Sequence, residues 1–241
     1  MGLSELLTEP LQYTFMRRAV ISCVALCFGC APVGVLLVLR RLSLMGDALS
    51  HAVLPGAAIG YIIAGQISLF YMASGGFLAG ILVAFLSGLI SRKTQLREDA
   101  SFAGFFIISV ALGVLIISTK DNAIDLMHVL LGSALAVDQS SLGIIMLISS
   151  FTLLVLAVIY RPLVIDSFDH QFLVYTQSRG HLYHNIFLLL VVLNLVSGFQ
   201  ALGTLLSLGL MLLPAIAARF WTKSIWSMMA LSIAIGSLSG V

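Results

Sequence analysis

The sequence predicts an all-α protein that crosses a membrane several times, and two observations lead to this prediction. The 241 residues are 60% hydrophobic and only 9% charged, whereas soluble domains carry about 25% charged residues. The apolar residues also form long unbroken runs, not the alternating pattern of a barrel strand, and in lipid such runs satisfy their backbone hydrogen bonds as helices. We therefore expect a polytopic helical membrane protein with a single domain that covers residues 1–241.

About eight membrane segments are expected, because a spanning helix needs about 20 apolar residues. We expect a break in the first double-length run at Gly65 and one in the second between Ser197 and Gly203. The run Ile124–Val137 is too short to span, so we expect a short helix there on the extracytoplasmic side. The expected spans are Ala19–Leu39, two helices within Ala48–Ser91, Ser101–Thr119, Ser140–Tyr160, two helices within Ile186–Ala218, and a helix from Ile225 to Val241.

The basic residues predict the orientation in the membrane. Of the 12 Lys and Arg residues, all but Arg17, Arg18 and Lys120 fall on the side that holds Arg40 and Arg41. The positive-inside rule places the larger group in the cytoplasm and the N-terminus outside. The net charge of +2 and the lack of a basic patch in the sequence argue against a nucleic-acid partner.

An aspartate and a histidine at the head of one apolar run are the main candidate site. Asp47 and His51 are four residues apart, so on a helix both side chains share one face. An ionisable pair in hydrocarbon is costly unless it faces a cavity or a partner. A carboxylate with an imidazole suits a borderline divalent metal such as zinc, manganese or iron. The alternative is structural: Asp47 follows Gly46 and caps the helix, and His51 lies at the membrane interface.

Other histidines offer weaker candidate sites. Asp125 and His128 are three residues apart but are expected near the outer surface, where solvated residues are common. His181 and His184 are expected in a cytoplasmic loop, either as a metal acceptor or as solvated residues. The sequence has no phosphate loop, nucleophile elbow or metalloprotease helix. We therefore expect no catalytic residue and no enzyme activity, and any energy coupling would need a partner.

Several segments resemble one known family over nearly the whole chain. The segment Leu44–Gly56 is similar to the hallmark of the ABC-3 permeases, the membrane subunits of bacterial zinc, manganese and iron ABC importers. This resemblance implies that Asp47 and His51 bind a transported divalent metal, with no resident cofactor. The further matching stretches are Asp125–Gly132, Tyr160–Asp169, Gly198–Leu205 and Met211–Ala215.

The resemblance also implies partners and a location. It implies a multi-pass protein of the bacterial cytoplasmic (inner) membrane that forms a homodimer, or a heterodimer with a related permease, within membrane lipid. Two cytosolic ATPase subunits would drive it, and an extracytoplasmic metal-binding protein would deliver the metal. Two departures from the family pattern, Leu173 and Gln177, concern the ATPase contact. The chain also ends earlier than family members usually do, so we expect a C-terminal truncation or a naturally early end.

The resemblance also indicates which segments would contact the ATPase and the binding protein. A cytoplasmic loop over about 161–185 is expected to dock the ATPase, with Phe168, Asp169 and Phe172 as the coupling residues. Phe168 and Phe172 are four residues apart and would form one apolar edge. Arg17 and Arg18 are expected to pair with carboxylates of the binding protein. Their alternative role is to extend toward the interface as ordinary membrane-flanking arginines.

Three other functions compete with metal import. An iron-chelate or corrinoid ABC permease would need a wide vestibule without metal ligands, which Asp47 and His51 argue against. A stand-alone ion-coupled secondary transporter would show inverted repeats, and the two halves of the chain show no convincing repeat. An intramembrane enzyme would need a second titratable cluster in the other spans. Zinc, manganese and ferrous iron share these ligands, so the metal stays open.

Overall fold

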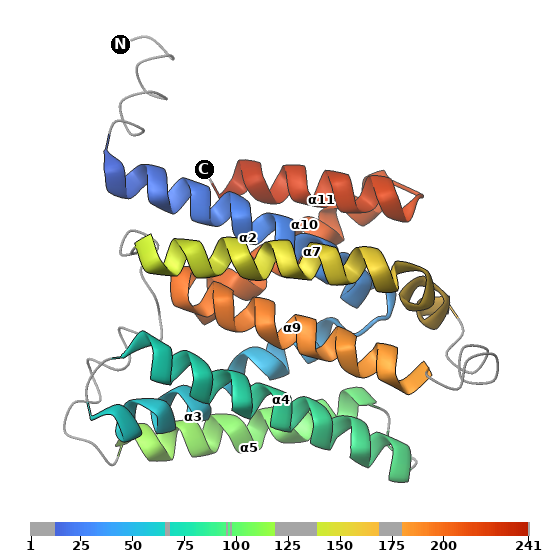
Figure 1. Cartoon of the computed structure of the whole chain (residues 1–241). Coiled ribbons are helices and arrows are strands. Elements are labelled where there is room, and N and C mark those ends of the chain that lie inside the picture. The colour runs from blue at the N-terminus through green and yellow to red at the C-terminus, as the bar shows by residue number, and fades with distance from the viewer. Residues whose placement is uncertain are drawn as a thin grey trace.

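The computed structural model describes residues 13–65, 68–94, 96, 98–118, 139–168 and 180–240. Within them the chain forms eight helices and no strand, as the sequence predicts (Figure 1). The helices are α2 (Thr14–Leu39), α3 (Ser43–Ala64), α4 (Leu69–Lys93), α5 (Glu98–Ser118), α7 (Gln139–Phe168), α9 (Gly180–Leu202), α10 (Thr204–Trp221) and α11 (Ile225–Ser239).

The eight helices correspond one to one with the eight expected membrane segments. Five of the described helices, α2, α3, α4, α7 and α9, are long and apolar enough to cross a membrane. The apolar parts of α5, α10 and α11 are shorter. The breaks fall at Gly65 and Gly203, both of which have positive φ angles that glycine adopts without strain. The short helix expected at Ile124–Val137 lies outside the described residues.

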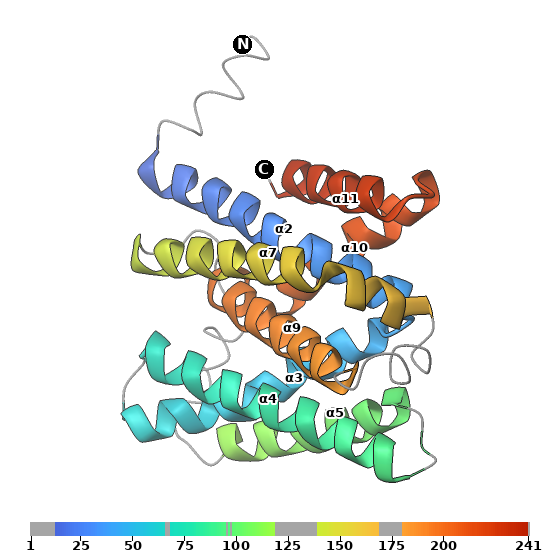
Figure 2. The same ribbon diagram turned by 45° about the vertical axis from the view of Figure 1, so that its right-hand side comes forward.

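The helices form two groups that run roughly parallel to one another (Figure 1). Helices α3, α4 and α5 pack together, and α2, α7, α10 and α11 gather on the other side of α9. Figure 2 shows the same separation after a 45° turn. The groups meet chiefly where α4 and α3 contact α9 and where α3 contacts α10. One apolar core extends through both groups and includes Leu36, Leu49 and Val191, each of which is fully buried.

Small and polar residues bring particular helices close. A Cβ atom added at Gly56 of α3 would overlap the carbonyl oxygen of Gly75 in α4, so only glycine permits this approach. Between α7 and α9, the Asn194 side chain donates a hydrogen bond of 2.8 Å to the hydroxyl of Thr152. Both side chains are fully buried. In an apolar surrounding such a bond joins two helices that van der Waals contacts alone would hold less specifically.

The connection between α2 and α3 is a tight turn with a defined geometry. The amide of Leu42 bonds the carbonyl of Leu37 and the amide of Arg41 bonds that of Val38, which is the Schellman arrangement. Arg41 has a φ of 59° at the position where glycine is usual. Because α3 starts at Ser43, directly after this turn, the end of α2 fixes the start of α3.

The structure differs from the sequence prediction at the loop expected over 161–185. Helix α7 continues through Arg161 and Pro162 to Phe168, and α9 already begins at Gly180. Proline removes one helical hydrogen bond, but here the helix continues because Leu163, the next residue, is fully buried in the core. The connection between the two helices is therefore shorter than expected, and residues 169–179 lie outside the described part of the chain.

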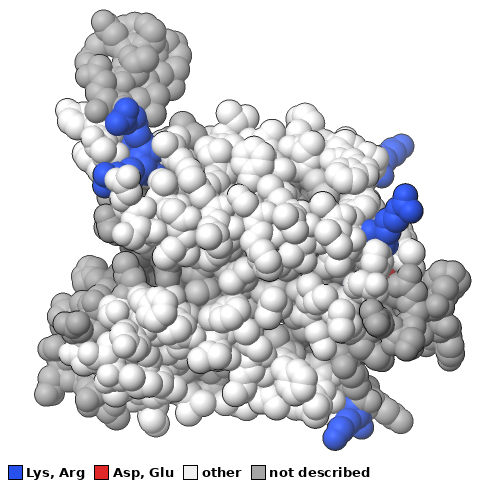
Figure 3. Space-filling view, viewed as in Figure 1, with Lys and Arg blue, Asp and Glu red and all other residues white. Residues whose placement is uncertain are grey.

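The described basic residues lie toward two opposite ends of the molecule. In the view of Figure 3, the Lys and Arg side chains occupy the two ends of the molecule, and the broad face between them has no described charge. The C-terminal ends of α2 and α10 lie together, since Arg219 donates a hydrogen bond to the carbonyl of Val38. This distribution is the one expected of a protein whose middle band lies in lipid.

Candidate functional site

Asp47 and His51 lie side by side on α3, as their spacing predicts. The Oδ1 atom of Asp47 is 3.7 Å from Nε2 of His51. The Asp47 side chain is 45% exposed in the single chain and that of His51 is 24% exposed. Both side chains therefore reach the surface of this subunit together, with a carboxylate oxygen and an imidazole nitrogen directed toward one place.

The capping role considered for Asp47 is wrong, because α3 begins four residues earlier at Ser43. Its N-cap is Leu42, and Asp47 lies in the second turn of the helix. With a rise of 1.5 Å per residue, Asp47 is about 6 Å and His51 about 12 Å along the helix from its start. The pair thus lies inside the helix, between its N-terminal end and its middle.

The surroundings of His51 are apolar on its buried side. The ring packs edge-on against Phe106 of α5, with 4.9 Å between the centroids. Its Nδ1 atom is buried and has no hydrogen-bond partner among the described residues. Four residues later comes Pro55, which has no amide proton, so the His51 carbonyl lacks its usual helical donor. The backbone oxygen of His51 is therefore left without its ordinary partner in the helix.

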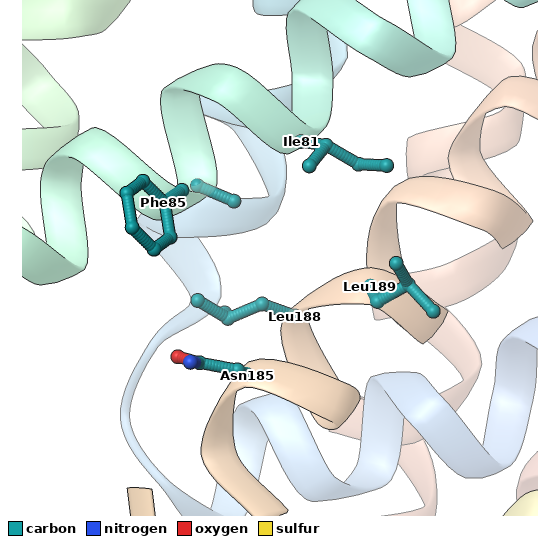
Figure 4. A pocket seen from close by; sticks show the side chains of 6 residues that line it. Ile81, Phe85, Asn185, Leu188 and Leu189 are labelled. Carbon is teal, nitrogen blue, oxygen red and sulfur yellow. The ribbon is translucent and has the colours of Figure 1, made fainter. Parts of the chain in front are cut away.

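The described part of the chain does not bring together a complete metal site. Among the described residues, no group of three or more His, Cys, Asp or Glu side chains is placed to hold a metal ion. A cavity of about 150 Å³ lies between α4 and α9, but its lining is apolar apart from Asn185 (Figure 4). A second, larger cavity of about 300 Å³ between α2, α7 and α11 is also apolar. Neither cavity contains a carboxylate or an imidazole.

The residues expected to contact partners lie at opposite ends of the molecule. Arg17 is exposed near the start of α2, whereas Arg18 is partly buried and donates a hydrogen bond of 2.9 Å to Gln139. Phe168 ends α7 with its side chain 79% exposed. Asp169 and Phe172 lie outside the described residues, so the apolar edge expected of Phe168 with Phe172 stays a prediction.

Sequence reasoning missed a buried ion pair where the C-terminal ends of α2 and α7 meet. Nη2 of Arg40 lies 2.8 Å from Oδ2 of Asp166, and these side chains are 5% and 2% exposed. The prediction that His184 belongs to a loop is wrong, because it lies in the first turns of α9. Its Nδ1 is 3.5 Å from Nη1 of Arg40. A charged residue at the end of each of two neighbouring spans was the available signal, but sequence alone does not show that the ends meet.

Comparison with known proteins identifies relatives over almost the full chain. The model of the ABC 3 transport family matches residues 12–241. A manganese import system permease protein of Streptococcus parasanguinis is 34% identical over 95% of this chain and 80% of its own. A chelated iron transport system membrane protein of Yersinia pestis is 29% identical over 99% and 79%. The structure of PsaBC from Streptococcus pneumoniae in complex with Fab superposes with a TM-score of 0.82, at 29% identity over 99% and 84%.

Proposed function

Because the chain belongs to the ABC 3 transport family, we propose that it is the membrane permease of an ABC importer for a divalent transition metal. The cargo we propose is manganese or ferrous iron, the metals in the names of its manganese and iron transport relatives. ATP hydrolysis belongs to a separate cytosolic subunit, and a binding protein supplies the metal from outside. Family membership favours this ATP-driven function over a stand-alone secondary transporter.

The observation that carries the proposal is the Asp47 and His51 pair. An ionisable pair at this depth costs several kcal/mol unless it faces water, a cavity or a charged ligand. Oxygen and imidazole nitrogen ligands suit manganese, iron and zinc. Their 3.7 Å separation allows one ion to bind both side chains after a small adjustment of either.

The incompleteness of the site fits transport. A metal-binding histidine usually donates its second ring proton to a fixed acceptor, which strengthens the site. Nδ1 of His51 has no such acceptor in the described part of the chain, which favours weak and reversible binding. Two ligand side chains are also too few for a closed site. We propose that a second subunit brings a matching pair to this exposed face, so that the pathway runs between subunits.

The experiment that tests this function is metal uptake by the reconstituted importer. The permease, purified with its ATPase and inserted in proteoliposomes, should accumulate radioactive manganese when ATP and the metal-loaded binding protein are supplied. The inhibition of manganese uptake by zinc and by ferrous iron then shows which of the three metals the importer prefers. Accumulation that is equally fast without ATP, or no accumulation of any of the three metals, would refute the proposed function.

Phe168 is proposed to dock the ATPase, and its replacement by aspartate tests this role. Its exposed ring at the end of α7 is large and apolar, as are residues that dominate protein interfaces. We expect Phe168→Asp to weaken ATPase binding by roughly tenfold or more. Binding is measured by titrating the ATPase onto the permease in nanodiscs. Tyr13→Asp, which changes a 60% exposed ring at the opposite end, is the control. Equal ATPase affinity in the two variants would contradict the assignment.

Arg17 and Arg18 are proposed to attract the binding protein, and Arg17 gives the cleaner test because Arg18 also bonds Gln139. Charge pairs at the rim of an interface act mainly on the association rate. Arg17→Glu should slow docking by roughly tenfold at low ionic strength and flatten its salt dependence. Association rates are measured across a salt series, with Lys223→Glu at the opposite end as the control. If the association rate and its dependence on salt concentration equal those of the wild type, Arg17 is only a membrane-flanking residue.

A further inference from the structure

One guanidinium joins three helices at the cytoplasm-facing end of the protein. Besides the ion pair with Asp166, Arg40 donates hydrogen bonds to the carbonyl of Leu163 at 3.2 Å and the hydroxyl of Ser167 at 3.3 Å. These partners all belong to the last turns of α7. On α9, Arg40 contacts Nδ1 of His184 and lies over the ring of Phe187, with its Cζ atom 4.4 Å from the ring centroid.

This cluster stands between two functional parts of the chain. Asp166 and Ser167 directly precede Phe168, the exposed residue proposed to face the ATPase. On the other side, Arg40 is the C-cap of α2, and the Schellman turn that follows leads directly into α3. Asp47 lies only seven residues after Arg40. The end of α7 and the start of the metal-binding helix are therefore both attached to one buried side chain.

Stability alone does not explain such a pair. An apolar pair of similar volume is often as stable as a buried ion pair, because burial removes the hydration of both charges. What the ion pair adds is a defined geometry, since the planar guanidinium fits its acceptors in one orientation. A device that transmits movement between two helices needs this property, because a loosely packed apolar contact lets the helices slide.

We propose that Arg40 is a positioning residue that holds the Asp47-bearing end of α3 to the ATPase-facing end of α7, so that movement of α7 on ATP binding moves the metal pair. The proposal rests on the proposed function. Asp166 is the principal anchor, and Ser167, the Leu163 carbonyl and His184 fix the plane of the guanidinium. Arg40 contacts neither Asp47 nor His51 in this role, since it acts through the α2–α3 turn.

The test uses a double variant that removes both charges without leaving one buried alone. Arg40→Met with Asp166→Leu keeps the side-chain volumes close and should insert and fold like the wild type. In proteoliposomes with the ATPase and the binding protein, we expect the manganese moved per ATP hydrolysed to fall by roughly tenfold, a coupling change of the usual size between sites. Thr152→Val, which removes the buried 2.8 Å bond between α7 and α9 away from this end, should leave this ratio unchanged.

A distance measurement tests the attachment without any metal. Spin labels at Val158→Cys and Ile59→Cys report the separation of α7 from α3, because both positions are exposed and neither is proposed to contact the ATPase, and the native Cys23, Cys27 and Cys30 are replaced by alanine. With the ATPase bound, adding a non-hydrolysable ATP analogue should leave a narrow distance distribution in this labelled parent. In the double variant the distribution should broaden or shift.

The outcomes separate the two proposals. A double variant whose distance distribution matches that of its labelled parent, with and without nucleotide, overturns the role of Arg40. The same conclusion follows if its manganese-to-ATP ratio equals that of the wild type. If the wild-type complex moves no metal at all, the proposed function fails, and the spin-label comparison still decides whether Arg40 holds the two helices together.

Discussion

Replacing Asp47 by asparagine or His51 by glutamine is expected to abolish manganese uptake while the permease still inserts and assembles with its ATPase. Asp47→Asn keeps the shape of the side chain, His51→Gln keeps a polar side chain of similar reach, and each removes a proposed metal ligand. Even outer-shell partners of metal sites contribute about 10- to 100-fold to affinity or activity. Loss of one of the two ligands that a subunit provides should therefore lower uptake by at least roughly a hundredfold. Both side chains are partly exposed, so neither substitution leaves a cavity in the core.

Uptake of radioactive manganese at limiting concentration measures the effect, and ATPase co-purification verifies assembly. Ser50→Ala is the matched control on the same helix, because the Ser50 hydroxyl donates its 2.8 Å hydrogen bond to the backbone carbonyl of Asp47 and not to either proposed ligand side chain. Its removal leaves both proposed ligands in place, and uptake should stay near the wild-type rate. If both single variants, Asp47→Asn and His51→Gln, take up manganese at the wild-type rate, the proposed metal site is refuted.

The spans could be predicted from sequence because membrane helices obey one dominant requirement, a long apolar run. Helix ends were harder, because local backbone geometry and tertiary contacts decide them. Arg41 takes the left-handed conformation that ends α2, although glycine usually does so, and α3 therefore starts before Asp47. The span was expected to end at Tyr160, yet the helix continues through Pro162 to Phe168. Burial of Leu163 and pairing of Asp166 with Arg40 compensate for the missing hydrogen bond.

The candidate site likewise has one part that the sequence could predict and one part that it could not. The spacing of Asp47 and His51 is local, so helix periodicity was enough to place them on one face. The pairing of Arg40 with Asp166 joins residues 126 positions apart in the sequence, and helix periodicity carries no information about which span ends meet. Arg40 therefore served only as an orientation marker in the sequence. His184 was placed in a loop because the basic and polar residues before it obscured the start of α9.

Replacing Asp166 by alanine is expected to destabilise the protein more than removing both members of the ion pair. The substitution leaves the Arg40 guanidinium buried and removes the carboxylate that lies 2.8 Å from it. Breaking a buried pair in this way costs about 3–5 kcal/mol, whereas apolar replacement of both partners is often neutral. Arg40→Met with Asp166→Leu should therefore unfold close to the wild type. This order of stabilities follows because the penalty comes from the unpaired charge rather than from the lost attraction.

The unfolding equilibria of wild type, Asp166→Ala, Arg40→Met and the double variant, measured in bicelles or mixed micelles, form a thermodynamic cycle that isolates the pair. Arg40→Met alone should also destabilise, since it removes the guanidinium that lies 2.8 Å from a carboxylate only 2% exposed. Arg18→Met is a suitable control, because its hydrogen bond to Gln139 is exposed and such contacts contribute little. If Asp166→Ala is as stable as the double variant, water or the neutral acceptors on α7 and α9 satisfy Arg40 without the carboxylate. The ion pair would then be neither a stabilising contact nor a rigid attachment between α7 and α3.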